Sequence, residues 1–341
     1  MSREETATTS PKGRPMKRLA WLLVALMVTL TVRLTLPWGG ELGAPGLDLE
    51  ARSRALRAEP LPGPFATLVD LHTLRGPTRP GDWLAEHTER GQSYAEFALD
   101  EPRLAAHPPP RLVIQLLGAL TSAQRGILDD VRDVVAASFC LPVETRAPLA
   151  LDTLPKRAWR DLAERGQRQY HTRFLLDELL APRREPGVAA LIGLTAVDLY
   201  PNPRWSFVFG SASLTERIGV WSIHRFGDPA SGIDAYQLCL RRAAKVAVHE
   251  LGHIFGLRHC IAYTCVMNGS NSLAETDRGV LRACPLCLRK LSETIGFDPH
   301  ARFASLERAY RSKGLERERR FVEASLARLG PAPDRDGREP R

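Results

Sequence analysis

The chain has 341 residues, of which 44% are hydrophobic and 25% charged, as in an ordinary globular protein. The length allows one large domain or two small ones. The net charge of +8 lies mainly at the ends, since residues 1–18 hold five Lys/Arg against two Glu and residues 301–341 hold eleven Lys/Arg against seven Asp/Glu. The middle is close to neutral, so we expect no nucleic-acid-binding surface.

An apolar run at residues 19–32 directly follows Lys17 and Arg18. Its fourteen residues suit the hydrophobic region of a signal peptide. Counting through Arg33 to Trp38 gives twenty, enough to span a bilayer if the arginine reaches the interface. A buried core helix is a third reading. We favour a membrane anchor over 19–38 with the amino terminus in the cytoplasm, which puts the rest of the chain on the far side; secretion after signal cleavage is the alternative.

Gly-, Pro- and Arg-rich sequence after the apolar run predicts a linker or extension over 39–79. Beyond it, apolar runs typical of strands alternate with helical periodicity, which indicates an α/β fold in layers (a layered α+β sandwich). The predicted elements are strands at 111–118, 141–148, 188–200, 205–210 and 218–226 and helices at 121–138, 156–181 and 234–256. We expect a charged helix over 301–329 and a disordered tail over 330–341.

Three histidines and a glutamate fall within residues 249–259, HELGHIFGLRH. His249 and His253 are four residues apart, so on a helix they lie on one face, where both imidazoles reach one metal ion. Glu250 points to the side of that ion, where a bound water would lie, and is a candidate general base. Gly256 permits a sharp end to the helix, which would return His259 as a third ligand. The alternative is a solvated helix with scattered histidines.

Four of the six cysteines are clustered after this segment. Cys260 and Cys265 have four residues between them, and Cys284 and Cys287 form a C-x-x-C. Two such pairs can supply four thiolates to a closed, structural zinc site. Two disulfides, or free buried thiols, are the alternatives.

Three further sulfur-containing residues have no spacing pattern of their own. Cys140 and Cys239 are predicted as small core residues. Met267 is followed by the turn dipeptide Asn268-Gly269 and, without the histidines, would be read as core.

The full string, H-E-x-x-H-x-x-G-x-x-H followed by C-x4-C-x-M and C-x-x-C, resembles the archaemetzincin family of metzincin zinc peptidases. The sequences VDLYP (197–201), FVFGSA (207–212) and GVWSIHRF (219–226) are similar to the family's strands before the zinc helix. RGQSYAEF (90–97) resembles a segment of its longer, vertebrate-type members. The similarity covers residues 80–300, which we expect to be the catalytic domain.

The resemblance implies a metzincin-like domain with a twisted mixed sheet, an active-site helix and a zinc-bearing C-terminal subdomain. It implies two Zn²⁺ per chain and a peptide or protein substrate, which would pair with the strand WSFVFG (205–210). A zinc-activated water would attack the peptide bond, with Glu250 as general base and Met267 in a turn beneath the histidines. The predicted ligands are His249, His253 and His259 for the catalytic zinc and Cys260, Cys265, Cys284 and Cys287 for the structural zinc. The alternatives are a non-catalytic, membrane-anchored peptide-binding module and an adaptor with two structural zincs.

Overall fold

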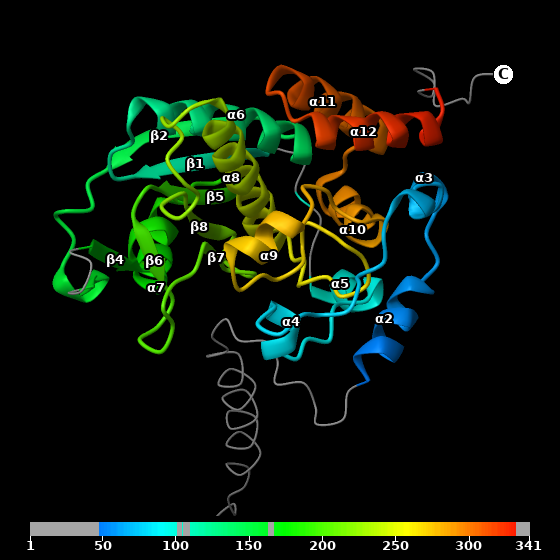
Figure 1. Cartoon of the computed structure of the whole chain (residues 1–341), viewed down its shortest axis with the longest axis horizontal. Helices are drawn as coiled ribbons and strands as arrows, with labels where there is room; N and C mark the ends of the chain where they lie inside the picture. The colour runs from blue at the N-terminus through cyan, green and yellow to red at the C-terminus, as the bar shows by residue number, and fades with distance from the viewer. Residues whose placement is uncertain (1–47, 101–103, 105–109, 163–166, 332–341) are drawn as a thin grey trace, which may run out of the picture. The chain divides into compact units, whose positions relative to one another are not determined.

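The computed structural model describes residues 48–100, 104, 110–162 and 167–331 (Figure 1). The predicted membrane anchor, 19–38, and the predicted disordered tail, apart from its first two residues, lie outside the described residues. Among the helices that are described, none has the length and apolarity needed to cross a membrane.

Eight strands and eleven α-helices are found in this part of the chain. The strands are β1 (Arg111–Leu117), β2 (Val143–Leu149), β3 (Trp159–Leu162), β4 (Gln167–His171), β5 (Val188–Thr195), β6 (Asp198–Tyr200), β7 (Gly210–Ala212) and β8 (Ile218–Ser222). The helices are α2 (Leu49–Arg57), α3 (Gly63–Ala66), α4 (Trp83–Glu86), α5 (Tyr94–Asp100), α6 (Ser122–Phe139), α7 (Thr172–Phe174), α8 (Ile233–Ile254), α9 (Leu273–Arg278), α10 (Pro285–Ile295), α11 (Pro299–Ser312) and α12 (Glu316–Leu329).

The larger sheet has the strand order β2-β1-β5-β8-β7. Its first four strands are parallel, and β7 pairs antiparallel with β8 at the edge, with Ser211 opposite Val220. A smaller sheet, β3-β4-β6, contains an antiparallel and a parallel pair. Parallel strands joined through helices, with one antiparallel edge strand, confirm the predicted α/β fold with a mixed sheet.

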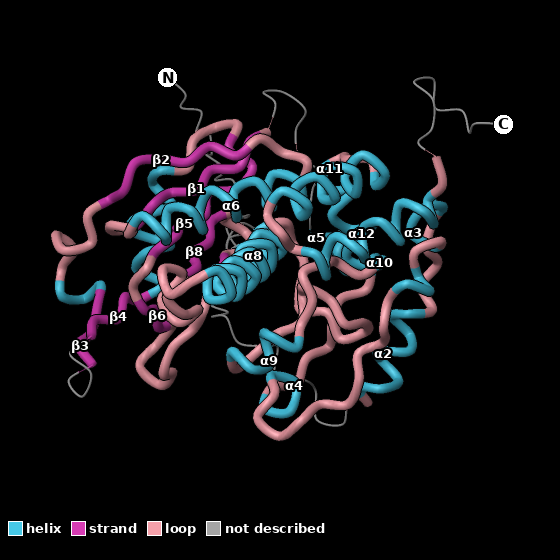
Figure 2. Tube along the Cα trace, turned by 45° about the horizontal axis from the view of Figure 1, so that its top comes forward, coloured by secondary structure: helices cyan, strands magenta, loops and turns pink. Residues whose placement is uncertain are grey.

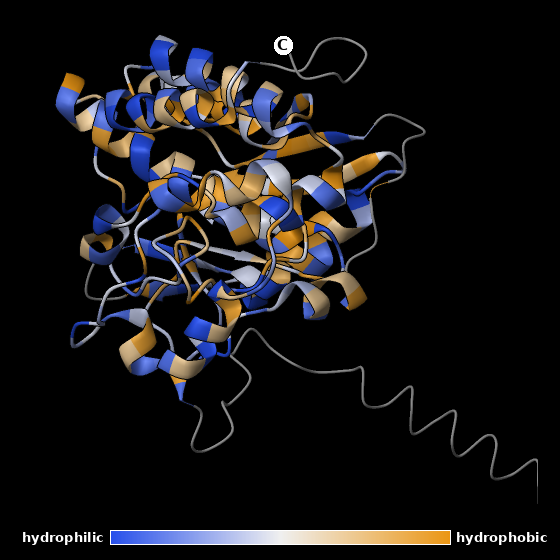
Figure 3. Ribbon diagram, turned by 90° about the vertical axis from the view of Figure 1, so that its right-hand side faces the viewer, coloured by the Kyte–Doolittle hydropathy of each residue, from blue (hydrophilic) through white to orange (hydrophobic). Residues whose placement is uncertain are grey.

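Other elements cover both faces of the larger sheet. The strands of this sheet therefore carry apolar side chains on both faces. In β1, Leu112, Ile114 and Leu116 belong to the core shared with α6 and α8, whereas Val113 and Leu117 belong to a second core on the other face. That second core is closed by the segment that contains α7 and a π-helical stretch. Figure 3 shows the apolar residues concentrated between these layers.

The long helix α8 lies against β7 and β8 and packs on α6 (Figure 2). It begins after Gly232, whose φ of +118° disfavours any side chain. Its apolar residues face the sheet, and its last turn carries the predicted metal motif. The helix therefore places the histidines near β7, the strand at one edge of the larger sheet.

Part of the range predicted as a linker or extension, 39–79, folds into helices with buried side chains. Leu56, Phe65 and Leu68 join the main core. The backbone then runs beside the cysteine segment, where Leu74 forms a bridge with Tyr263. The composition suggested a linker because helices of four to nine residues leave little periodicity to detect.

The helix predicted at 156–181 is wrong in its first half, which contains β3 and β4, whereas Thr172–Phe174 and Leu175–Leu180 are helical. There β3 and β4 pair as antiparallel strands, with Trp159 opposite Tyr170. Arg168 and Lys156 stack on the Trp159 ring at 3.7 Å and 3.5 Å from its centroid. Cross-strand aromatic and cationic contacts of this kind stabilise strands and outweigh a helical pattern of apolar residues.

Three other boundaries differ from prediction. The strand predicted at 188–200 is broken after Thr195, whose hydroxyl accepts a hydrogen bond from the Val197 amide at 3.2 Å. The strand predicted at 205–210 lies instead at 210–212, and before it only Val208 forms a bridge. The helix predicted at 301–329 is two helices, separated by Gly314 at φ +66°.

The prediction for Cys140 is also wrong, because this residue is exposed. It ends α6 in the left-handed conformation, with φ of 53°. Cys239 on α8 is fully buried, as predicted for a core residue.

Candidate active site

The structure brings together the three histidines that the sequence predicts as ligands. The nitrogen atoms that His249, His253 and His259 offer all lie within 4.8 Å of one another. Nδ1 of His249 is 2.8 Å from the Val266 carbonyl oxygen, and Nδ1 of His253 is 2.6 Å from that of Leu257. These hydrogen bonds hold the proton on Nδ1 and leave Nε2 as the ligand atom.

The donor set fits a zinc ion. The Nε2 atoms of His249 and His253 are 3.0 Å apart, and two lone pairs that face each other at this distance repel unless a cation lies between them. Desolvation, followed by the charge of neighbouring imidazoles, lowers the pKa of His249 to about 3 and that of His253 well below its ordinary range. Both rings are therefore neutral, which is the form that binds zinc.

Glu250 lies beneath the edge strand, next to the histidines in the chain. Its side chain is buried, and its Oε2 atom has no hydrogen-bond partner among the described residues. Burial raises the pKa of Glu250 well above its ordinary range, whereas a divalent cation beside it would favour the carboxylate. A buried carboxylate with an unused acceptor beside a ligand cluster is suited to accept a proton in a reaction.

Gly210 of β7 covers the Glu250 side chain. A Cβ atom at Gly210 would lie 2.7 Å from both Cγ and Cδ of Glu250. The edge strand and the carboxylate can approach this closely only because the strand has no side chain at that position.

Gly210→Ala is therefore expected to displace the Glu250 carboxylate and lower turnover by about 10- to 100-fold, with zinc content unchanged. Kinetics with a peptide substrate and metal analysis check this. Gly76→Ala is the matched control, because a Cβ there meets nothing within 4 Å. Unchanged turnover in the Gly210 variant would show that this contact does not position Glu250.

The turn predicted at Gly256 is present. Gly256 has φ of +84°, and its amide donates to the His253 carbonyl at 2.9 Å. The amide of Leu257 donates to the Gly252 carbonyl at 3.0 Å. This pair of bonds is a Schellman motif, which ends the helix with a left-handed residue and reverses the chain toward His259.

Met267 packs against the histidine-bearing turn of α8, at Gly252. A Cβ atom at Gly252 would overlap its Sδ atom and lie 3.0 Å from its Cε atom. The Met267 carbonyl also accepts from the Cys260 amide at 2.8 Å. The methionine thus joins the floor of the histidine cluster to the start of the cysteine cluster.

The four clustered cysteines converge on one point. Their Sγ atoms all lie within 4.8 Å of one another, and those of Cys260 and Cys284 are 3.7 Å apart. Four thiolates about 2.3 Å from a zinc ion at tetrahedral angles have sulfurs about 3.8 Å apart. The amides of Met267 and Cys284 lie 3.4 Å and 3.3 Å from the Cys265 sulfur. None of the four forms a disulfide, so the geometry fits a closed zinc site.

Three residues upstream of the first strand reach His259 or the turn before it, and no spacing pattern marks them as site residues. Glu89 contacts the His259 imidazole, Trp83 donates to Glu89, and Gln92 binds the turn at Gly256. Burial alone would raise the pKa of Glu89, but His259 and Trp83 hold it below its ordinary value. Only Gln92 falls in the segment 90–97 whose sequence resembles the longer family members.

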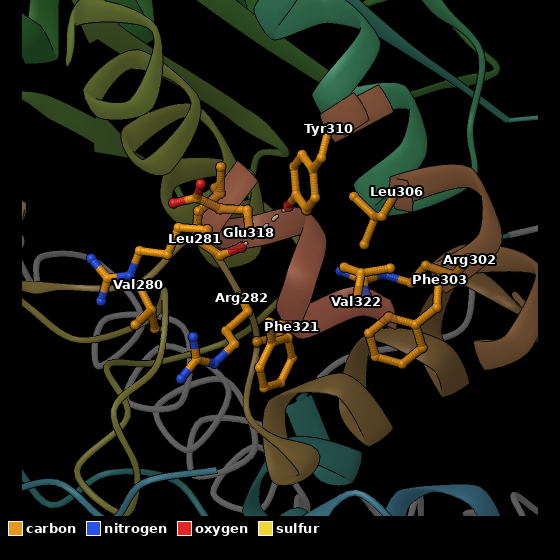
Figure 4. A pocket seen from close by; sticks show the side chains of 12 residues that line it. Val280, Leu281, Arg282, Arg302, Phe303, Leu306, Tyr310, Glu318, Phe321 and Val322 are labelled. Atoms are coloured by element: carbon orange, nitrogen blue, oxygen red, sulfur yellow. Dashed lines mark hydrogen bonds between the residues drawn. The ribbon is translucent and has the colours of Figure 1, made fainter. Parts of the chain in front are cut away.

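Figure 4 shows a cavity between α11, α12 and the segment 280–283, away from the histidines. Tyr310 lines it and donates to the Leu281 carbonyl at 3.2 Å. Its volume of about 20 Å³ is enough for one water molecule. A cavity of this size excludes a peptide substrate.

A larger hollow, of about 440 Å³, lies beside the edge strand. Its lining combines apolar side chains with polar ones: Phe207, Phe209 and Leu273, and Gln167, His224, Arg225 and Ser272. The Arg225 guanidinium donates twice to the buried carboxylate of Asp198, at 2.8 Å and 2.6 Å, so its charge is largely neutralised. The hollow therefore has both apolar and polar walls, and its apolar wall includes the two phenylalanines.

Comparison with known proteins places this sequence in a family. A sequence model described as peptidase family M54 matches residues 163–293. Archaemetzincin-2 of Pongo abelii is 32% identical over 262 residues, covering 67% of this chain and 72% of that protein. Archaemetzincin of Pyrococcus furiosus is 38% identical over 151 residues, covering 43% and 76%. The crystal structure of archaemetzincin from Methanopyrus kandleri is 30% identical and covers 57% of this chain and 100% of that one, with a TM-score of 0.46. The chain belongs to the archaemetzincin family of zinc metallopeptidases.

Proposed function

We propose that this chain hydrolyses peptide bonds with zinc held by His249, His253 and His259 and with Glu250 as the general base. The observation that carries the proposal is the convergence of three imidazoles beside a buried carboxylate that has an unpartnered oxygen. Zinc held at this site would supply Lewis acidity, which would polarise the scissile carbonyl and lower the pKa of water toward about 7.

The residues around the site have distinct roles in this proposal. The carbonyls of Val266 and Leu257 fix the tautomers of two histidines, so that Nε2 faces the ion. Glu250 takes a proton from the attacking water and delivers it to the leaving amine. The four cysteines would hold a second zinc, which would fix the loop that carries Met267.

The substrate is proposed to bind as an extended peptide along β7. This strand is the last in the order of the larger sheet and runs over Glu250 at Gly210. An extended chain can add to such an edge through backbone hydrogen bonds. The hollow lined by Phe207 and Phe209 adjoins the start of the strand and favours an apolar or aromatic substrate side chain.

Digestion of a peptide library by the zinc-loaded protein, with sequencing of the products, tests this function. Cleavage is expected to stop with a chelator, to return with zinc, and to show enrichment of apolar residues near the cut bond. Absence of cleavage by protein with a full complement of zinc would contradict the proposal.

The location of the protein is a separate proposal. The apolar run at 19–38 after Lys17 and Arg18 supports a membrane anchor. The full chain is expected to pellet with membranes and resist a carbonate wash, whereas a chain that lacks residues 1–38 should stay in the supernatant and keep its activity. A mature chain that begins near residue 44 would indicate a cleaved signal instead.

A further inference from the structure

The segment Trp83–Gln92 lies along the turn that returns His259 to the other histidines. It begins in α4, which is held on α9 by a hydrogen bond from the Trp83 amide to Glu275 at 3.0 Å. Figure 1 shows α4 and α9 as neighbours although they are far apart in the sequence. This segment therefore has a fixed position next to the site.

Glu89 makes the closest contact between this segment and the ligand cluster. Its Oε1 atom is 2.5 Å from Nδ1 of His259. The same oxygen accepts from Nε1 of Trp83 at 2.7 Å, and the Trp83 ring lies edge-on to the His259 ring at 5.1 Å between centroids. The Nδ1 partner of His259 is thus a carboxylate, whereas the Nδ1 partners of His249 and His253 are backbone carbonyls. The contact with Glu89 leaves Nε2 of His259 as its ligand atom.

Gln92 fixes the backbone of the same turn from its other side. Its Nε2 atom donates to the Gly256 carbonyl at 3.0 Å, and its Oε1 atom accepts from the Arg258 amide at 3.3 Å. Gln92 is buried, and its own carbonyl accepts from Lys290 at 2.5 Å. The backbone before His259 and its imidazole are therefore both held by the segment Trp83–Gln92.

We infer that Glu89 is a positioning residue of the catalytic zinc site, which orients the His259 imidazole through Nδ1. The inference rests on the proposed zinc site at the three histidines. A carboxylate that accepts from Nδ1 fixes the ring and makes Nε2 a stronger donor to the metal. The active site of this chain accordingly includes a residue from the segment Trp83–Gln92, in addition to α8 and the loop that follows it.

Zinc affinity of the full chain, measured by competition with a chromogenic chelator, tests the inference without reference to activity. Glu89→Ala is expected to weaken zinc binding at the histidines by about 10- to 100-fold, with zinc at the cysteines retained. Glu89→Gln keeps an acceptor oxygen without the charge, so a smaller loss is expected. Glu86→Gln is the matched control, because Glu86 is exposed in the same short stretch of chain.

The possible outcomes separate this inference from the proposed function. Equal affinity in the wild-type, Glu89→Ala and Glu89→Gln chains would overturn the role of Glu89 and leave the zinc site standing. A wild-type chain without zinc at the histidines would overturn both. If Glu89→Ala also loses zinc from the cysteines, its fold has failed and Glu89→Gln becomes the deciding variant. With zinc at the cysteines intact, weaker zinc binding at the histidines of Glu89→Gln supports the role of Glu89. Unchanged zinc binding at the histidines refutes it.

Discussion

Replacing Glu250 by glutamine is expected to lower peptide turnover by at least about 100-fold while zinc content stays at the wild-type level. Glutamine has nearly the same size, so it fits beneath Gly210 in the space that Glu250 occupies. It lacks the basic oxygen that would take a proton from water. Because Glu250 is not among the three nitrogen ligands, the histidine cluster should remain intact.

The measurement combines steady-state kinetics on a cleaved library peptide with metal analysis of the same preparation. Glu216→Gln is a suitable control, since Glu216 is exposed in the turn between β7 and β8 and the change in charge is the same. Turnover close to that of the wild type in Glu250→Gln would refute the assigned mechanism. Loss of zinc from that variant would show instead that Glu250 supports the metal site.

The convergence of the proposed metal ligands could be predicted from the sequence because their geometry is mostly local. A spacing of four residues on a helix aligns His249 and His253, and Gly256 permits the turn that returns His259. The four clustered cysteines follow within residues 260–287. At such short separations, helix geometry and one left-handed glycine determine where the side chains lie, whatever the rest of the fold does.

The surroundings of the ligands could not be predicted, because they depend on contacts between distant segments. Glu89 reaches His259 across 170 residues, and Gly210 meets Glu250 through the pairing of β7 on the edge of the sheet. The antiparallel pair of β3 and β4 was missed for a similar reason, since the pairing of Trp159 with Tyr170 outweighs local helical periodicity. Tertiary packing decides such features, and a single sequence carries little trace of it.

The cysteine cluster yields the second large expected effect, which concerns stability. Cys284→Ser is expected to lower the zinc content from two ions per chain to one or fewer and to lower the thermal midpoint markedly. Structural zinc contributes about 10–16 kcal/mol of binding free energy in small zinc-binding peptides, and that energy is available only to the folded state. Cys284 is fully buried, so its replacement also leaves a polar hydroxyl without a metal partner.

The effect should extend to the histidine site, because the two clusters share backbone. Cys260 follows His259 directly, and its amide is bonded to the carbonyl of Met267 at 2.8 Å. Cys140→Ser is the matched control: Cys140 is exposed, and its thiol approaches only the Ala137 carbonyl, at 3.8 Å, among the contacts found in the described residues. This control should keep both the zinc content and the thermal midpoint of the wild type.

Thiol counting decides between zinc and the alternative of disulfides. After denaturation with a chelator, the wild-type chain is expected to show six reactive thiols, or five where an oxidising compartment has oxidised the exposed Cys140. Thiolates bound to zinc resist oxidation because the ion occupies their lone pairs and the fold closes around them. The sulfur separation of 3.7 Å between Cys260 and Cys284 suits a shared ion and is far longer than the S–S bond of about 2.05 Å. A count of two thiols, with zinc only at the histidines, would show that the cluster forms disulfides and would remove the second metal site from the proposal.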